Sequence, residues 1–310
     1  MFAKTAGLRD VSNTANVLGR LRLKPIPTYK PTEPVKERYD IDLPPAGDPL
    51  AAYVHDIYNY LRDFEQRTHP LCTFLDKQHD ITPENRAVVV DWLVDVHVRF
   101  RSVPESLFTA VNYLDRFLSF KTVVRTKLQL VAYTALFLAC KFEDVYTPRL
   151  KHWIKLVHPS ILKPDLLRAE RLMVATLQFD LAAPSAFTFL RRFTKIAEAD
   201  VLIKYSAHYL IELALMDAEY IKYYPSLQAA AALSVCLQLY GRSPWSAGLE
   251  SYSKYRVEDL TSAVCFYKKV LNQAKGLDKY SRTKKAIFNK YSSSSYNGIA
   301  LRVQERLNQM

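Results

Sequence analysis

The 310-residue sequence holds little glycine and little cysteine. Only 7 glycines occur, and no segment alternates valine with threonine, so the composition favours helices over a β-sheet. The 4 cysteines (Cys72, Cys140, Cys236 and Cys265) form no Cys-x-x-Cys pair, and the 7 histidines show no metal-ligand spacing. We therefore expect a chain from a reducing compartment, with no disulfide framework, no cofactor and no bound metal.

Catalytic and membrane-spanning patterns are missing as well. The sequence has no Gly-x4-Gly-Lys loop, no His-Glu-x-x-His and no Gly-x-Ser-x-Gly, so we predict that it is not an enzyme. The longest apolar run, residues 130–140, has 11 residues, whereas a bilayer-spanning helix needs roughly 20. No signal-peptide block occupies the first 20 residues. We expect a soluble chain of the nucleus and cytoplasm with no membrane partner.

The charge is strongly positive, at +12, because 43 Lys and Arg residues outnumber 31 Asp and Glu residues. Such an excess occurs in proteins that bind nucleic acid, acidic partners or phosphorylated groups. The positive residues are scattered along the chain, so a solvated surface explains them equally well. We expect no direct nucleic-acid partner.

Residues 1–47 differ in composition from the rest of the chain. They contain six of the 16 prolines and no periodic apolar pattern, so we predict a disordered arm. A leading helix follows, with Asp48 as its N-cap, and Thr82 is the N-cap of a second helix. Residues 102–105 (SVPE) predict a capping box at the start of a third helix. Three further helical patterns are KLQLVAYTALFLACKF, TPRLKHWIKLV and KPDLLRAERLMVATLQF.

The second half of the sequence repeats this scheme. Its third helix, PSLQAAAALSVCLQLYG, resembles LQLVAYTALFLACK of the first half at an offset of 99 residues. Alanines in both segments predict a central helix that its neighbours approach closely. We therefore divide the chain into an arm, a leading helix with a first five-helix unit, a second five-helix unit and an irregular tail, at residues 1–47, 48–180, 181–275 and 276–310.

Several motifs resemble one family. NRAVVVDWLVDVH is similar to the MRAILVDWLVEV helix of A- and B-type cyclins, and VNYLDRFLS, KLQLVAYTALFLACKFEDVYTP and LQFDLAAP follow in the family's order. FLRRFTK and YYPSLQAAAA resemble B-type mitotic cyclins. The resemblance covers residues 48–275, with a weaker echo, KYSSSSYNGIAL, in the tail. It implies an all-α fold of two tandem cyclin boxes that binds and activates a cyclin-dependent kinase, with a role in the cell cycle at G2/M.

The resemblance also implies which residues contact the kinase. Lys141 and Glu170 match positions that hydrogen-bond the kinase backbone in related cyclins. Apolar contacts are expected from the residue after Lys141, from the end of the first box and from one face of the leading helix: Phe142, Phe179, Leu181, Tyr53, Ile57 and Tyr60. Without the family, Lys141 would be a cation favourable to a helix C-terminus, and the leading helix would pack on a box.

Residues 85–100 raise a separate question, because this helix is apolar on two faces. The second face resembles a docking patch for substrates and inhibitors that carry an Arg-x-Leu motif. We predict an apolar floor for the leucine, a carboxylate for the arginine, a hydrogen bond to the docked backbone and a rim where relatives have methionine: Val88, Val89, Trp92, Asp95, Gln129 and Asn85. The alternative is that Trp92 belongs to the core and Asp95 is solvated.

Two further sets of residues follow from the resemblance. Arg86 and Asp115 match a buried salt bridge between the first two helices of the box. Arg191, Lys204 and His208 match, in altered order, a phosphate pocket of B-type cyclins, in which three cationic groups would hold the ligand. The alternative for these three is a solvated basic surface.

The arm carries patterns typical of degradation signals. Arg20 and Leu23 fit Arg-x-x-Leu, and LRDVSN at residues 8–13 resembles the end of a mitotic destruction box, although Thr5 stands at its arginine position. These patterns predict recognition by ubiquitin-ligase machinery.

Other classes of protein stay open. A general transcription factor with cyclin-like repeats would suit the positive charge, but such factors carry a zinc ribbon, which the isolated cysteines exclude. A cyclin of a polymerase kinase shares the fold but lacks the docking patch. The remaining alternative is a helical scaffold without a kinase partner.

Overall fold

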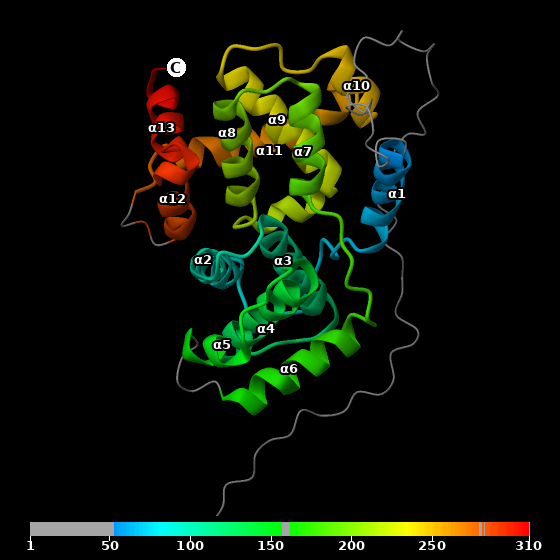
Figure 1. The fold of residues 1–310 in the computed structure, drawn as a ribbon, viewed down its shortest axis with the longest axis vertical. Coiled ribbons are helices and arrows are strands. Elements are labelled where there is room, and N and C mark those ends of the chain that lie inside the picture. Colours follow the sequence, from blue (N-terminus) through cyan, green and yellow to red (C-terminus); the bar gives the residue numbers. More distant parts are fainter. Residues whose placement is uncertain (1–52, 157–161, 279–280, 282, 310) are drawn as a thin grey trace, which may run out of the picture. The chain divides into compact units, whose positions relative to one another are not determined.

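The computed structural model describes residues 53–156, 162–278, 281 and 283–309. All of them belong to one unit, Glu37–Met310. The predicted arm, with Arg20 and Leu23, and the predicted N-cap Asp48 lie outside these residues. Every regular element in the described ranges is a helix, which confirms the all-α prediction (Figure 1). Among these helices, none combines the length and apolar character that a bilayer crossing requires.

The described helices repeat as the sequence predicts. The leading helix is α1 (Val54–Arg67). The first box comprises α2 (Pro83–Phe100), α3 (Pro104–Phe120), α4 (Arg125–Glu143), α5 (Leu150–Leu156) and α6 (Lys163–Thr176). The second comprises α7 (Ala186–Ile196), α8 (Val201–Ala214), the 3-10 helix η2 (Ala218–Lys222), α9 (Pro225–Leu239), α10 (Ala247–Ser253) and α11 (Val257–Ala274). Beyond it lie α12 (Lys285–Tyr291), η3 (Ser294–Tyr296) and α13 (Ile299–Gln309).

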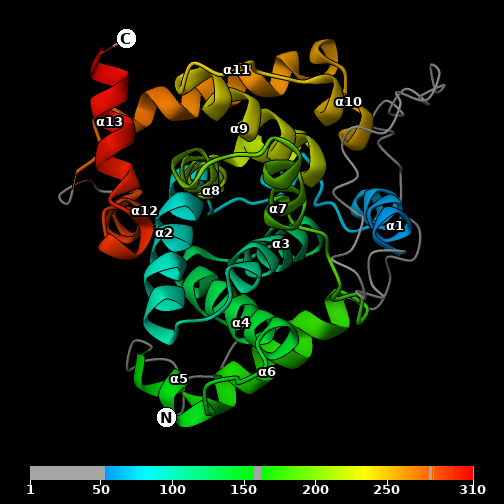
Figure 2. The same ribbon diagram turned by 45° about the horizontal axis from the view of Figure 1, so that its top comes forward.

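Each box is built around its third helix. In the first box, α4 packs against α2, α3 and α6, and in the second, α9 packs against α7, α8 and α11 (Figure 2). The alanines on these helices, among them Ala135 and Ala231, are fully buried, so backbones approach closely without a cavity. The close contact explains the sequence similarity between α4 and α9.

The starts of α2 and α3 are capped differently: a residue nearby in the sequence caps α2, and a distant one caps α3. Thr82 caps α2 as predicted: its Oγ1 accepts the backbone N–H of Asn85 at 3.3 Å, and Asn85 Oδ1 accepts the N–H of Thr82 at 3.2 Å. The predicted capping box at residues 102–105 is wrong. The N-cap of α3 is Val103, and its N–H donates to the Asp144 carboxylate at 3.0 Å. A distant acceptor at the end of α4 has replaced the local one.

The expectation of an irregular tail is also wrong. Helix α12 packs against α2 and α8, and α13 packs against α8 and α11. Asp91 of α2 accepts the N–H of Ala286 in the first turn of α12 at 3.1 Å. In the same helix, Lys290 donates to Glu212 of α8 at 2.6 Å, and both side chains are almost fully buried. The serines between α12 and α13 form turns within a folded segment, although their composition is typical of a linker.

Candidate functional site

The pair Arg86 and Asp115 lies at the centre of the described unit. The guanidinium donates from Nε and Nη2 to the two carboxylate oxygens, each at 2.7 Å, and both side chains are fully buried. A third donor, Arg86 Nη1, reaches the carbonyl of Leu215 at 2.7 Å, and the hydroxyl of Tyr220 donates to Asp115 at 2.7 Å. Since Leu215 and Tyr220 follow α8, this network joins the first box to the second.

Lys141 and Glu170, the two residues predicted to hydrogen-bond the kinase and called the clamp below, are in contact with each other. Lys141 lies in the last turn of α4 and Glu170 in the middle of α6, and the two side chains form an ion pair. The ammonium also lies 4.4 Å from the centre of the Phe137 ring, a favourable cation–π distance. The Lys141 side chain is 42% exposed, and Phe142, the next residue, is 48% exposed. A charged pair and an apolar ring therefore share one accessible edge of the first box.

The structure separates the two apolar residues predicted after α6. Phe179 is 78% exposed, and its backbone has a φ of 59° directly after Gln178 at 55°. Two successive left-handed residues without glycine are unusual, and such strain is typical of functional segments. Leu181 packs instead against the core, and its carbonyl accepts the hydroxyl of Tyr113 at 2.7 Å. Phe179 is thus the accessible member of this predicted pair.

Helix α1 packs on the second box through one face. Tyr58 donates to the carbonyl of Thr188 at 3.3 Å, and the Glu65 carboxylate accepts the N–H and the hydroxyl of Ser226 at 2.8 and 2.6 Å. Arg62 donates to the carbonyl of Ser253. Because burial outweighs the bonds from Ser226, the pKa of Glu65 is raised to about 7. These contacts fix the orientation of α1.

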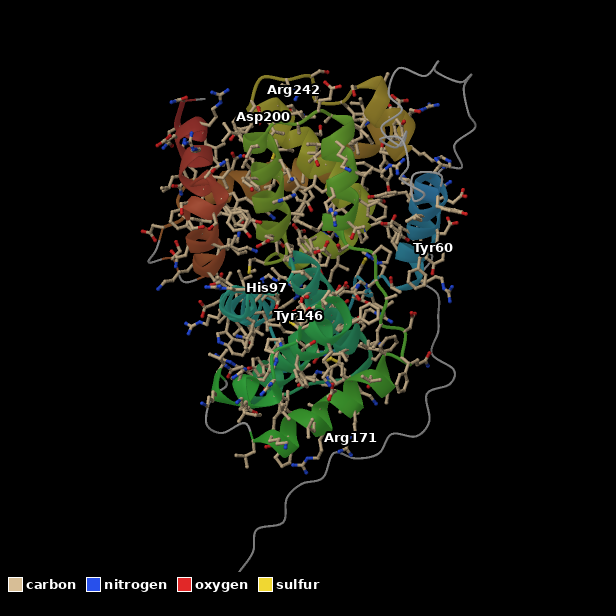
Figure 3. All side chains as sticks on the ribbon, in the orientation of Figure 1. Tyr60, His97, Tyr146, Arg171, Asp200 and Arg242 are labelled. Carbon is tan, nitrogen blue, oxygen red and sulfur yellow. The ribbon has the colours of Figure 1, made fainter. Side chains whose placement is uncertain are left out.

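The opposite face of α1 is the one that the sequence singled out. Tyr53, Ile57 and Tyr60 are all exposed, and Tyr60 projects from α1 in Figure 3. The leading helix thus packs on a box, as the alternative expected, but it does so through Tyr58 and Glu65 and not through these three exposed residues. Tyr60 and Phe142 line the same cleft of about 220 Å³, where α1, the start of α3, the end of α4 and the linker before α7 meet. The cleft connects the exposed face of α1 to the edge that carries Lys141.

Two exposed residues were missed by the sequence reasoning. Val145 and Tyr146, in the loop after α4, are 87% and 92% exposed, and Figure 3 labels Tyr146. The sequence signal for them was a Val-Tyr pair just beyond the C-terminus of a helix and directly before Thr147-Pro148. Exposed apolar side chains of this size are uncommon outside interaction surfaces when they cluster. They extend the accessible apolar edge beyond Phe142.

The residues of the predicted docking patch lie on α2 and α4. Val88 is exposed, and Val89 and Trp92 are partly buried, with the Trp92 ring 5.4 Å from that of Tyr133. Gln129 is partly exposed on the second turn of α4. Trp92 is therefore partly buried, which is intermediate between the predicted docking floor and the alternative of a core residue.

The two polar ends of this patch have partners within α2. Asn85 belongs to the capping box with Thr82, which accounts for a polar residue at this end of the patch. Asp95 is not simply solvated: its Oδ2 accepts Arg99 Nε at 2.9 Å, one turn further along the helix.

The predicted phosphate pocket contains two cations and a neutral ring. Arg191 is exposed and pairs with Glu105 at 3.2 Å, and Lys204 is exposed. His208 is buried against Phe187, with ring centres 4.8 Å apart. Burial, followed by the nearby positive charges of Lys204 and Arg191, lowers the pKa of His208 to about 3. At neutral pH this histidine is uncharged, so it is not the third cation that the sequence suggested.

The geometry describes an all-α protein with two joined helical repeats, and the comparisons with known proteins agree. Residues 56–182 match the family described as "Cyclin, N-terminal domain" and residues 184–305 match "Cyclin, C-terminal domain". The chain belongs to the cyclin family. The second match reaches through α12 into α13, in agreement with a folded tail. Membership of this family is our ground for describing the chain as a regulatory protein and not as an enzyme.

The relatives are mitotic cyclins. The chain is 37% identical to the G2/mitotic-specific cyclin cdc13 of Schizosaccharomyces pombe and 38% identical to cyclin-B2-2 of Arabidopsis thaliana, each over 86% of this chain and 54% and 61% of the relative. It is 34% identical to the G2/mitotic-specific cyclin-A of Drosophila melanogaster over 87% of this chain and 54% of that protein. It thus spans little more than half the length of these relatives.

A solved structure shows the same fold. The viral cyclin of herpesvirus saimiri superposes with a TM-score of 0.64 at 20% identity, covering 70% of this chain and 97% of the viral protein. At this identity the likeness concerns the fold alone.

Proposed function

We propose that this chain binds and activates a cyclin-dependent protein kinase that acts at G2/M. One observation carries the proposal: the Lys141–Glu170 ion pair lies on an accessible edge next to the exposed ring of Phe142, and the segment after α6 exposes a second ring, Phe179. Large apolar side chains that cluster on a surface mark a partner site. The mitotic cyclins among the relatives supply the class of partner and the stage of the cycle.

The mechanism follows from the needs of a kinase. Phosphoryl transfer is efficient only after the αC helix moves in and its glutamate pairs with the catalytic lysine. A stiff partner that binds only this conformer raises its population by the difference in affinity, and a shift from 1:99 to 99:1 takes ~5.5 kcal/mol. Lys141 offers N–H donors and Glu170 offers acceptors for kinase backbone groups, while the rings bury apolar surface.

Exchanging the two charges tests the clamp. The variant Lys141→Glu with Glu170→Lys retains the internal ion pair but places each charge where the opposite one is needed. We expect kinase binding to weaken about 10- to 100-fold, because a hydrogen bond to a charged group contributes ~1.5–3 kcal/mol. Binding is measured by calorimetry, and activation by phosphorylation of a histone substrate.

A matched exchange provides the control. Lys222 and Glu219 form an exposed pair on η2 at 2.8 Å, away from the proposed clamp, and swapping them should leave kinase binding unchanged. Full binding and full activation by the Lys141/Glu170 exchange would refute the clamp.

We also propose that α2 recruits substrates and inhibitors that carry an Arg-x-Leu motif. The support is the exposed side chain of Val88, one helical turn before the partly buried ring of Trp92. Trp92→Ala should weaken binding of an Arg-x-Leu peptide about 30-fold, the loss of ~2 kcal/mol that is typical of a tryptophan hot spot. Since Trp92 also packs on Tyr133, the exposed change Val88→Asp is a second test that leaves the core intact.

The readout compares two substrates of the kinase complex. Phosphorylation of an Arg-x-Leu substrate should fall for both variants, while a short peptide substrate without the motif is turned over at the wild-type rate. Val201→Ala, at another exposed valine, is the control. Equal turnover of the Arg-x-Leu substrate by all four proteins contradicts the docking proposal.

A further inference from the structure

The carboxylate proposed to receive a substrate arginine already has an arginine partner. Asp95 Oδ2 accepts the Nε of Arg99 at 2.9 Å, and the two residues stand four positions apart on α2. An acidic residue four positions before a basic one is the favourable order for a helical ion pair. The pair is in solvent, with Arg99 60% and Asp95 46% exposed, so it opens and closes readily.

The geometry makes the two arginines competitors. Arg99 uses one donor and one carboxylate oxygen. An arginine from a docked peptide binds most selectively with two parallel hydrogen bonds, which need both oxygens of Asp95. Arg99 must therefore release Oδ2 before that arrangement forms, and its positive charge then lies next to the incoming one.

The surroundings of Asp95 add to this effect. A cleft of about 550 Å³ between the end of α2 and the segment from α12 to η3 is lined by Asp95 together with Arg101 and Lys290. Lys290 is neutralised by Glu212, but Arg101, at the end of α2, contributes a second nearby positive charge. The cleft lining therefore does not compensate for the charge of Arg99.

We infer that Arg99 is a specificity-determining residue that lowers the preference of the docking patch for arginine. This inference rests on the proposed docking function. The wild-type chain selects mainly for the leucine of the motif, and it accepts a neutral polar residue at the arginine position nearly as well. A chain without Arg99 selects for arginine.

The test uses two labelled peptides that differ only at the arginine position, one with Arg-x-Leu and one with Gln-x-Leu. Binding to the full chain is measured by fluorescence polarisation at low ionic strength. Arg99→Ala should tighten binding of the arginine peptide about two- to threefold, in line with an exposed pair, and leave the glutamine peptide unchanged. Lys222→Ala, which removes an exposed cation from another ion pair, should change neither peptide.

A double-mutant cycle identifies the cause. In the Asp95→Asn background, Arg99→Ala should no longer affect the arginine peptide, because the shared carboxylate is gone. The inference is wrong, and docking stands, if Arg99→Ala leaves the ratio of the affinities for the two peptides unchanged. This includes the case in which the glutamine peptide gains as much affinity as the arginine peptide. If neither peptide binds either protein, the docking function itself fails, and the inference fails with it.

Discussion

The buried pair Lys290–Glu212 offers the most direct test that the tail is part of the fold. Lys290 is 4% and Glu212 2% exposed, and the hydroxyl of Tyr291 donates to the same carboxylate oxygen at 2.8 Å. Lys290→Met leaves the carboxylate buried without its cation, and Glu212→Gln leaves the ammonium buried without its anion. Either loss should cost ~3–5 kcal/mol, since an uncompensated buried charge is strongly destabilising.

The corresponding thermal shift is large enough to measure. At about 2–4 °C per kcal/mol for a protein of this size, each single change should lower Tm by roughly 6–20 °C. The double variant Glu212→Gln with Lys290→Met removes both charges and keeps an amide oxygen as acceptor for Tyr291. It should recover most of the lost stability, because exchanging a buried ion pair for neutral groups is often close to neutral.

Calorimetry and urea titration of the four proteins complete the cycle. An exposed pair provides the control: Arg168→Met, which breaks the surface contact with Asp165, should change stability by less than about 1 kcal/mol. Two results would refute the reasoning. One is a Lys290→Met variant as stable as wild type, and the other is a double variant less stable than both single ones.

Two further outcomes follow from α1 and α2. The raised pKa of Glu65, from its ordinary value of 4.5 to about 7, means that the folded chain holds this proton more tightly than the unfolded chain does, so stability falls as pH rises through this window. Glu65→Gln lacks this titration, and its stability relative to wild type should increase between pH 5 and pH 8 in urea titrations; a constant difference contradicts the assignment. Asn85→Met removes half of the capping box at Thr82 and should cost about 0.5–1 kcal/mol, measured by thermal unfolding. An Asn85→Met variant as stable as wild type would show that the cap contributes nothing.

The predicted fold relied on signals that are local in the sequence. Thr82 followed by proline marks the start of α2, and the alanine-rich segments of α4 and α9 mark the two central helices. Each of these signals depends on neighbouring residues alone, so a single sequence displays it. The resemblance of the motifs then supplied the arrangement of the boxes.

The predictions failed where a residue distant in the sequence supplies a hydrogen bond that no local residue makes. The start of α3 is held by Asp144, about forty positions away, and the first turn of α12 is held by Asp91, about two hundred positions away. Glu65 would be read as a solvated residue of the leading helix, but it is buried because Ser226 supplies its hydrogen bonds. No pattern within a short window reveals such partners.

The sequence predicted which residues make up the candidate site, but not all of their ion pairs or their exposure. The sequence placed Lys141 and Glu170 together by resemblance, and the structure brings them into contact. It named Asp95 as the carboxylate for a substrate arginine, although Arg99 four positions later indicated a helical ion pair. Exposure also needed the three-dimensional structure, because Phe179 and Leu181 are both large apolar residues only two positions apart, yet Phe179 is exposed and Leu181 packs against the core. The degradation patterns of the arm, the ubiquitin-ligase partner and the localisation stay predictions.

The bond from Arg86 to the carbonyl of Leu215 has a consequence for how the molecule can be divided. A fragment that ends after the first repeat would lose the Leu215 acceptor and the hydroxyl of Tyr220, and it would present the Arg86–Asp115 pair to water. We therefore expect the two boxes to unfold in one cooperative transition, and we expect neither box to fold on its own.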